Sequence, residues 1–85
     1  MADVAPKEFA KTLTEEERML LTLRDELYEG NWDNMLQDLR DRLKGKPYIF
    51  KLVNRIEEDI VRIERLKKYE GDHSVNLTDY LEEGT

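Results

Sequence analysis

The chain has 85 residues and a mass of 10.2 kDa, enough for one small domain. It contains 39% hydrophobic and 40% charged residues and carries a net charge of −6, which favours solvated helices over full disorder. The absence of cysteine and the single histidine exclude disulfides, thiol nucleophiles and a structural zinc site within one chain. A chain of this size buries only about 60 to 65% of its unfolded surface, so we do not expect an enclosed catalytic pocket.

Residues 1–13 carry scattered apolar side chains around Pro6 and predict an N-terminal tail that is either flexible or docked through Phe9. The first residues show neither the basic region nor the apolar region of a signal peptide. No stretch approaches the roughly 18 apolar residues that a membrane span needs. We therefore expect a cytoplasmic protein with no membrane partner.

Thr14 and Glu17 have the spacing of a capping box and predict a first helix over residues 15–29. At 100° per residue, the apolar residues of this helix form two stripes. We expect the first stripe to face the core; it contains Met19, Leu20, Leu23 and Leu27. The second stripe contains Leu21 and Tyr28, and a small bundle has little room to bury it. It is predicted to be covered by the chain termini or by another molecule.

Asn31 is a good N-cap and predicts a second helix over residues 32–44. Its apolar residues fall within one arc and form the most amphipathic pattern of the chain: Trp32, Met35, Leu36, Leu39 and Leu43. An aromatic residue in the first turn of such a helix anchors either a core or an interface. Trp32 is therefore a candidate contact residue as well as a candidate core residue.

Pro47 suits a first helical position, and Gly71 suits a helix end, so a third helix is predicted over residues 47–70. Its core stripe repeats every three or four residues: Ile49, Leu52, Val53, Ile56, Ile60 and Ile63. The short connection predicts an antiparallel hairpin of the second and third helices. The longer third helix leaves a surplus over residues 60–69, which the first helix, the C-terminal segment or another chain must cover.

The predicted fold is all-α, a three-helix bundle over residues 14–71 with less ordered N- and C-terminal tails. Residues 72–85 form an acidic C-terminal segment with one short helical turn capped by Asn76. Its apolar residues are candidates for covering the bundle: Val75, Leu77, Tyr80 and Leu81.

Catalytic chemistry finds little support in the residues. His73 lies in a polar stretch after Gly71, which is typical of a solvated loop histidine. Consecutive helical carboxylates such as Glu57 and Asp59 point in different directions and do not converge on one ion. No phosphate-binding or metal-binding motif is present. We therefore expect no enzyme activity, no cofactor, no metal ion and no small-molecule substrate.

The net charge conceals a reversal along the chain. Residues 1–41 sum to −6, residues 42–70 to +4 and residues 71–85 to −4. On the third helix, Lys51, Arg55 and Arg62 share one face and form a basic stripe. The stripe indicates either an anionic partner or pairing with acidic segments of the same chain. A net charge of −6 disfavours nucleic acid.

These patterns predict a non-enzymatic protein–protein interaction module that self-associates, most simply as a dimer, or docks on a larger protein. The predicted contact surface is the apolar surplus of the third helix together with four candidate residues: Leu21, Tyr28, Trp32 and Phe50. The alternative is a regulator that binds RNA, DNA or an acidic protein through the basic stripe of Lys51, Arg55 and Arg62.

Overall fold

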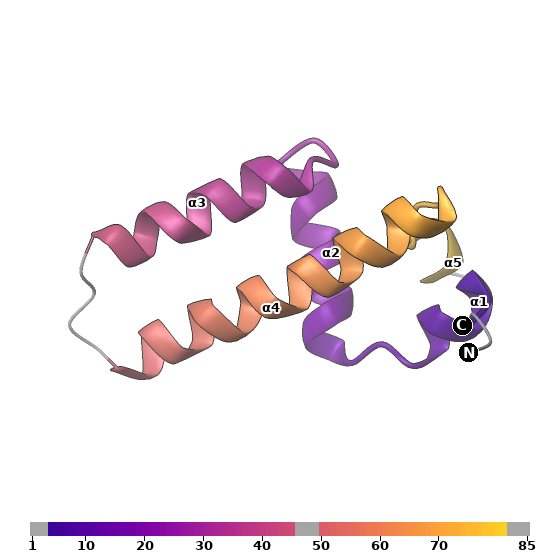
Figure 1. The fold of residues 1–85 in the computed structure, drawn as a ribbon, viewed down its shortest axis with the longest axis horizontal. Coiled ribbons are helices and arrows are strands. Elements are labelled where there is room, and N and C mark those ends of the chain that lie inside the picture. The colour runs from indigo at the N-terminus through magenta and orange to yellow at the C-terminus, as the bar shows by residue number, and fades with distance from the viewer. Residues whose placement is uncertain (1–3, 46–49, 82–85) are drawn as a thin grey trace.

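A computed structural model describes residues 4–45 and 50–81, apart from the side chains of Phe50 and Lys51. All regular structure in these two ranges is helical (Figure 1). The helices, in chain order, are α1 (Pro6–Lys11), α2 (Glu15–Leu27), α3 (Trp32–Lys44), α4 (Phe50–His73) and α5 (Thr78–Leu81). The prediction of a small all-α bundle is confirmed.

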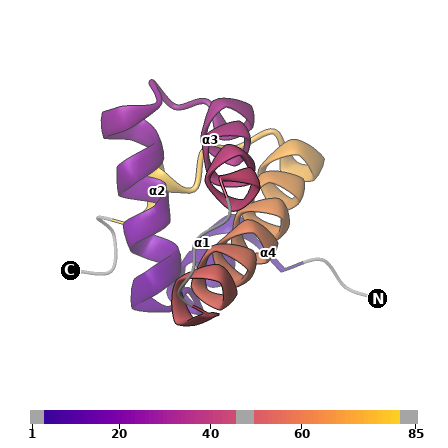
Figure 2. The ribbon, with the colours of Figure 1, turned by 90° about the vertical axis from the view of Figure 1, so that its left-hand side faces the viewer.

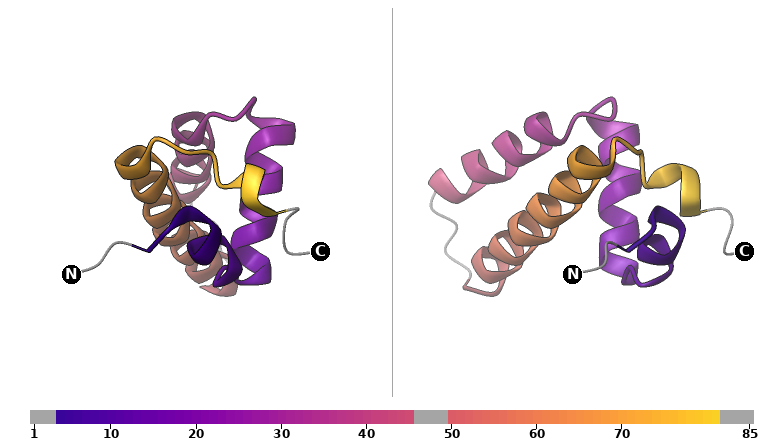
Figure 3. Two further views of the ribbon diagram at one scale, coloured as in Figure 1. Left: turned by 90° about the vertical axis from the view of Figure 1, so that its right-hand side faces the viewer. Right: turned by 45° about the vertical axis from the view of Figure 1, so that its right-hand side comes forward.

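The arrangement of the helices leaves the two ends of the molecule unlike each other. α3 packs on α4, α2 packs on α4 and α5, and α1 packs on α5. α2 crosses the long pair, and α3 and α4 extend past it on one side, while α1 and α5 lie together on the other (Figures 1 and 3). The connection 46–49 and the predicted helix start at Pro47 lie outside the described residues, so the antiparallel hairpin stays a prediction.

The predicted starts of α2 and α3 are confirmed by their caps. Glu17 N donates to Thr14 Oγ1 at 3.2 Å, and Thr14 N donates to Glu17 Oε1 at 3.1 Å, which completes the capping box. Asn34 N donates to Asn31 Oδ1 at 3.1 Å at the start of α3. Side-chain caps therefore fix both N-termini by satisfying amides that have no partner within the helix.

Other helix boundaries differ from the predictions. α2 ends at Leu27, before two residues with positive φ, of which Gly30 (φ +78°) adopts this conformation most easily. α4 continues through Gly71 to His73, because the positive φ that ends it belongs to Ser74 (φ +53°). The glycine at position 71 is thus a helical residue, and the predicted end at residue 70 is wrong.

Parts of both predicted tails are helical. α1 forms within the N-terminal segment, and the Phe9 ring stacks on Tyr69 with centroids 3.8 Å apart and planes 7° apart. Docking through Phe9 is therefore confirmed. α5 is the predicted short C-terminal turn, and Thr78 N donates to Asn76 Oδ1 at 3.0 Å.

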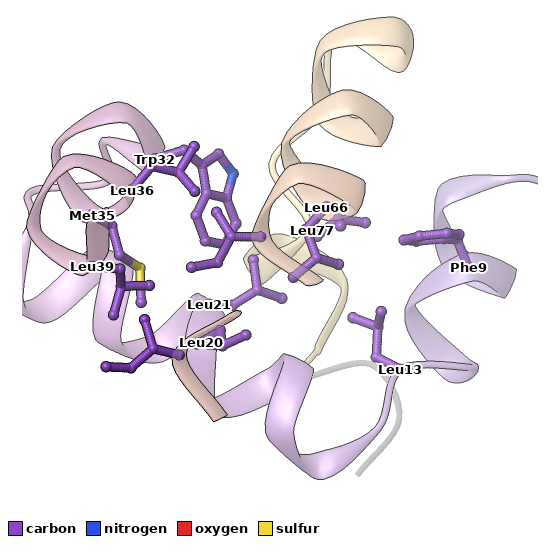
Figure 4. Close-up of a cluster of buried hydrophobic side chains, with 12 residues drawn as sticks. Phe9, Leu13, Leu20, Leu21, Trp32, Met35, Leu36, Leu39, Leu66 and Leu77 are labelled. Atoms are coloured by element: carbon purple, nitrogen blue, oxygen red, sulfur yellow. The ribbon is translucent and has the colours of Figure 1, made fainter. Parts of the chain in front are cut away.

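The hydrophobic core runs from α3 across α2 and α4 to α1 (Figure 4). Leu77, which follows α4, belongs to it. Its largest fully buried side chains are Leu21, Ile63, Leu66 and Leu77. The predicted surplus of the third helix, residues 60–69, is therefore covered to a large extent by the chain itself.

The core-facing side of α2 matches the predicted stripe only in part: Leu20 is buried and Leu23 packs against the core. Met19 and Leu27 are 59% and 67% exposed, whereas Leu21 is fully buried. The buried stripe spaces its residues by four and three positions and includes two charged residues, Glu17 and Arg24. The prediction is therefore wrong for Met19 and Leu27. Apolar periodicity alone does not identify buried charged residues, because their burial is compensated by partners far away in the sequence.

Candidate interaction surface

The Arg24 side chain is buried and lies at the centre of a polar cluster. Its Nε donates to Asp25 Oδ1 at 2.9 Å and its Nη1 donates to Glu70 Oε1 at 2.7 Å. The guanidinium lies 4.5 Å from the centre of the Trp32 ring, and Trp32 Nε1 donates to Glu70 Oε1 as well. The cluster links α2, α3 and α4 through one buried cation, whose charge the carboxylates neutralise.

The same cation holds the C-terminal segment. Arg24 Nη2 donates to Asn76 Oδ1 at 2.8 Å and to Thr78 Oγ1 at 3.1 Å. Leu77 N donates to Glu70 Oε2 at 2.7 Å, and the Leu77 side chain is buried in the core. The segment before α5 is thereby fixed to α2 and α4 by hydrogen bonds on both sides of one apolar anchor.

Burial acts to lower the pKa of Arg24, but its hydrogen bonds to Asp25 and Glu70 outweigh burial and raise the pKa above the ordinary value. Burial acts to raise the pKa of Asp25, and the hydrogen bonds from Arg24 and Thr78 outweigh it and lower that pKa. Both groups are held in their charged forms at neutral pH. The cluster is suited to holding helices together and not to exchanging protons.

A second packed cluster surrounds α1. Glu17 is buried and forms an ion pair with Arg65. The Arg65 guanidinium lies 4.8 Å from the centre of the Phe9 ring. Tyr69 stacks on His73 with centroids 3.9 Å apart. His73 is thus a half-buried helical residue packed on an aromatic ring, and its assignment to a solvated loop is wrong.

The predicted apolar contact residues do not form one exposed surface. Leu21 is wholly inside the core, where Leu77 from the C-terminal segment joins the same cluster. Of the two predicted ways to cover this residue, the chain terminus is therefore the observed one, and Leu21 is not a contact residue. Trp32 is buried and hydrogen-bonded, so it anchors the core. Tyr28 is half-buried, and its hydroxyl donates to Asp38, which together with burial raises the pKa of Tyr28. The Phe50 side chain lies outside the described residues.

The predicted basic stripe does not form a continuous cationic surface in the described residues. Arg62 pairs with Asp59 at 2.9 Å and with Glu58 at 3.6 Å, and the latter pair is the one that helical spacing predicts. Arg55 is exposed and has no ion pair among the described residues. The Lys51 side chain is not described.

Most other cations of the basic segment are also paired within the chain. The further pairs made by cations of residues 42–70 are Arg42–Asp38, Arg65–Glu17, Lys67–Asp33 and Lys68–Asp72. Arg40, which precedes this segment, pairs with Glu64. The positive charge of residues 42–70 is therefore largely balanced by carboxylates of the same molecule.

The structure does bring together an exposed apolar surface where α2, α3 and α4 meet, and we call it the open face. Two adjoining hollows of about 290 and 280 Å³ share Arg55 and Asp59 as lining residues. The apolar side chains of the open face are Met19, Leu20 and Leu23 of α2, Leu39 of α3, and Leu52 and Ile56 of α4. Figure 2 shows α2 beside the pair of α3 and α4, viewed from the side on which these two helices extend past it.

The open face has a buried floor and exposed walls. Leu20, Leu39 and Ile56 are buried, whereas Met19 is 59% and Leu52 46% exposed. Both exposed residues belong to apolar stripes that are predicted to face the core, and for these two residues that prediction is wrong. Their exposure depends on the angle at which α2 crosses α4, which local periodicity does not contain.

The described ranges contain neither a metal-binding cluster nor a membrane-spanning helix. Within residues 4–45 and 50–81, no three His, Cys, Asp or Glu side chains gather closely enough to hold a metal ion. None of the described helices combines the length and the hydropathy that crossing a bilayer requires. Comparison of the chain with protein-family models, with curated proteins and with solved structures gives no match.

Proposed function

We propose that the chain is a non-enzymatic protein-interaction module whose docking surface is the open face. The observation that carries this proposal is the exposure of Met19 and Leu52 above a buried apolar floor contributed by three helices. Covering these side chains removes apolar surface from water, at about 25 cal/mol per Å². A concave apolar surface edged by charged residues is the usual anatomy of a protein contact.

The charges of the open face support a protein partner. Arg55 has no ion pair among the described residues and lies between the two hollows, where a partner carboxylate could reach it. Glu15 and Glu16 line the same face and are likewise exposed. Unpaired charges beside an apolar contact give register and specificity more than affinity.

The anion-binding alternative has weaker support. A nucleic acid would require several cations in a row, but Arg62 is neutralised by Asp59 and Glu58. Arg55, the other stripe cation whose side chain the structure describes, shares its hollow with Glu15 and Glu16, which repel a phosphate backbone. The cytoplasmic location remains part of the proposal.

The test is site-specific photo-crosslinking in an extract of the native cells. A photoreactive residue replaces Met19 or Leu52 on the open face. In the matched controls it replaces Leu27 or Val61, which are 67% and 68% exposed and do not line the hollows of the open face. We expect discrete protein adducts from the first pair and none from the controls, both with and without nuclease.

Two results would contradict the proposal. Equal labelling at Leu52 and Val61 would show that any exposed apolar residue reacts, so that the open face is not special. Adducts that disappear on nuclease treatment would assign the face to a nucleic acid.

A further inference from the structure

We propose that the occupant of the open face is a second copy of this chain, in a two-fold arrangement that sets Arg55 of each copy against Glu15 and Glu16 of the other. This inference rests on the proposed function and names its partner. In a two-fold interface every contact occurs twice, because residue i of the first copy contacts residue j of the second, and residue j of the first contacts residue i of the second. A self-complementary face must therefore carry both members of each contact.

The charges of the open face meet that requirement. Among the described side chains, it carries two cations, Arg42 and Arg55, and three carboxylates, Glu15, Glu16 and Asp59. The face is thus nearly neutral although the chain has a net charge of −6, so a second copy meets little local repulsion.

Of these five groups, Arg42 is paired with Asp38, and Asp59 with Arg62. Arg55, Glu15 and Glu16 have no ion pair within the described residues. The unpaired set is one cation and two carboxylates, which a two-fold axis converts into two ion-pair contacts.

The shape of the molecule is also self-complementary. The end of the α3–α4 pair extends past α2 (Figures 1 and 2). One hollow lies between α2 and α4, and the adjoining one lies between α3 and α4. A projection beside a recess allows two copies to interlock, each placing Leu52 toward Met19 and Leu23 of the other. A standard interface takes about 800 Å² per partner, roughly an eighth of the 6282 Å² surface of the chain.

The decisive experiment is a charge exchange between two variants, with the oligomeric state of the purified full chain measured by sedimentation equilibrium. Arg55→Glu sets like charges against each other twice in a homodimer, and so does the double variant Glu15→Arg/Glu16→Arg. We expect each variant alone to dissociate with a Kd at least about tenfold higher than the original chain. Mixing the two variants restores both contacts in a heterodimer, and we expect the original affinity to return.

The control variant is Arg40→Glu, which removes an exposed ion pair with Glu64 outside the open face. We expect it to leave the dimer Kd within about twofold of the original. A chain that stays monomeric up to about 1 mM would overturn the inference, since the contact would then be weaker than about 4.1 kcal/mol. So would a dimer whose Kd the exchange does not change, or that mixing does not restore.

The double variant Glu15→Arg/Glu16→Arg could lose stability for another reason, because Glu15 and Glu16 also stabilise the first turn of α2. A second measurement therefore tests the contact without this variant. The chain contains no cysteine, so single cysteines can be placed freely. A mixture of Arg55→Cys and Glu16→Cys chains should give a disulfide-linked heterodimer on mild oxidation. A mixture of Arg55→Cys and Val61→Cys chains should not.

The outcome also separates this inference from the proposed function. Photo-crosslinks from Leu52 to a different protein, with a monomeric pure chain, would leave the open face as a docking surface and remove the second copy as its occupant. Adducts of twice the chain mass support both.

Discussion

At its C-terminal end, α4 is enclosed by α1, α2 and the segment leading to α5, whereas its N-terminal end packs on α3 and leaves Leu52 46% exposed (Figures 1 and 3). We call residues 63–73 of α4 with the segments around them the closed end, and residues 50–59 with the end of α3 the open end. Fully buried leucines and paired buried charges concentrate at the closed end. The difference indicates that one end holds the fold together and leaves the other available for recognition.

Removing the buried cation of the closed end, Arg24, should have the largest effect on the stability of the fold. Arg24→Met leaves Glu70 and Asp25 as carboxylates without their buried partner, so the free energy of unfolding should fall by about 3 to 5 kcal/mol. Urea denaturation followed by circular dichroism measures it. Arg55→Met makes the same chemical change at the open end and should cost less than about 0.5 kcal/mol. Equal losses from the two variants would remove the distinction.

A smaller but still large effect is expected from the apolar anchor of the C-terminal segment. Leu77→Ala empties a fully buried site and should lower the free energy of unfolding by about 2 to 5 kcal/mol. The control is Leu27→Ala, at a residue that is 67% exposed, which should change it by less than about 0.5 kcal/mol. Thermal unfolding of both variants suffices, and a loss at Leu77 no larger than at Leu27 would contradict the assignment.

Amide hydrogen exchange sharpens the comparison without any substitution. Amides of residues 52–58 should be less protected than those of residues 63–70 by about tenfold or more, since fewer elements enclose the open end. Uniform protection along α4 would mean that the helix opens only as one unit. At concentrations where the proposed dimer forms, protection of residues 52–58 should rise.

The smallest expected effect is an increase in the free energy of unfolding. Gly71 lies within α4, and a Cβ placed there meets nothing within 4 Å, so Gly71→Ala should raise the free energy of unfolding by about 0.5 to 1 kcal/mol. Gly30→Ala should instead destabilise by about 1 kcal/mol, because the positive φ at that position disfavours a side chain. A loss at position 71 would show that the closed end tolerates less change than the structure indicates.

Local signals were sufficient to predict where α2 and α3 begin. The capping box of Thr14 and Glu17 and the cap of Asn31 mark the starts of α2 and α3 at the observed residues. α1 carries no such side-chain cap and is six residues long, too short to be stable in isolation. Its stabilising contact, the stack of Phe9 on Tyr69, spans most of the chain and leaves no local trace.

The surface was harder to predict than the helices, because exposure depends on partners far away in sequence. Arg24 is buried since Glu70 and Asn76 receive its hydrogen bonds, and Glu17 is buried beside Arg65. Without these pairings, an apolar stripe containing Met19 is the better candidate for the core. The open face was therefore hidden within the residues that the sequence assigns to the interior.

The position of Leu77 in the core also affects how the molecule is made. Synthesis proceeds from the N-terminus, so the ribosome completes Leu21 and Leu66 before it adds the residue that packs with them. Until then Leu21 and Leu66 lack one of the side chains that pack with them, and the cation of Arg24 lacks its partners Asn76 and Thr78. The core is thus completed late in folding, after α4 has been translated, by a segment of three residues, Asn76, Leu77 and Thr78.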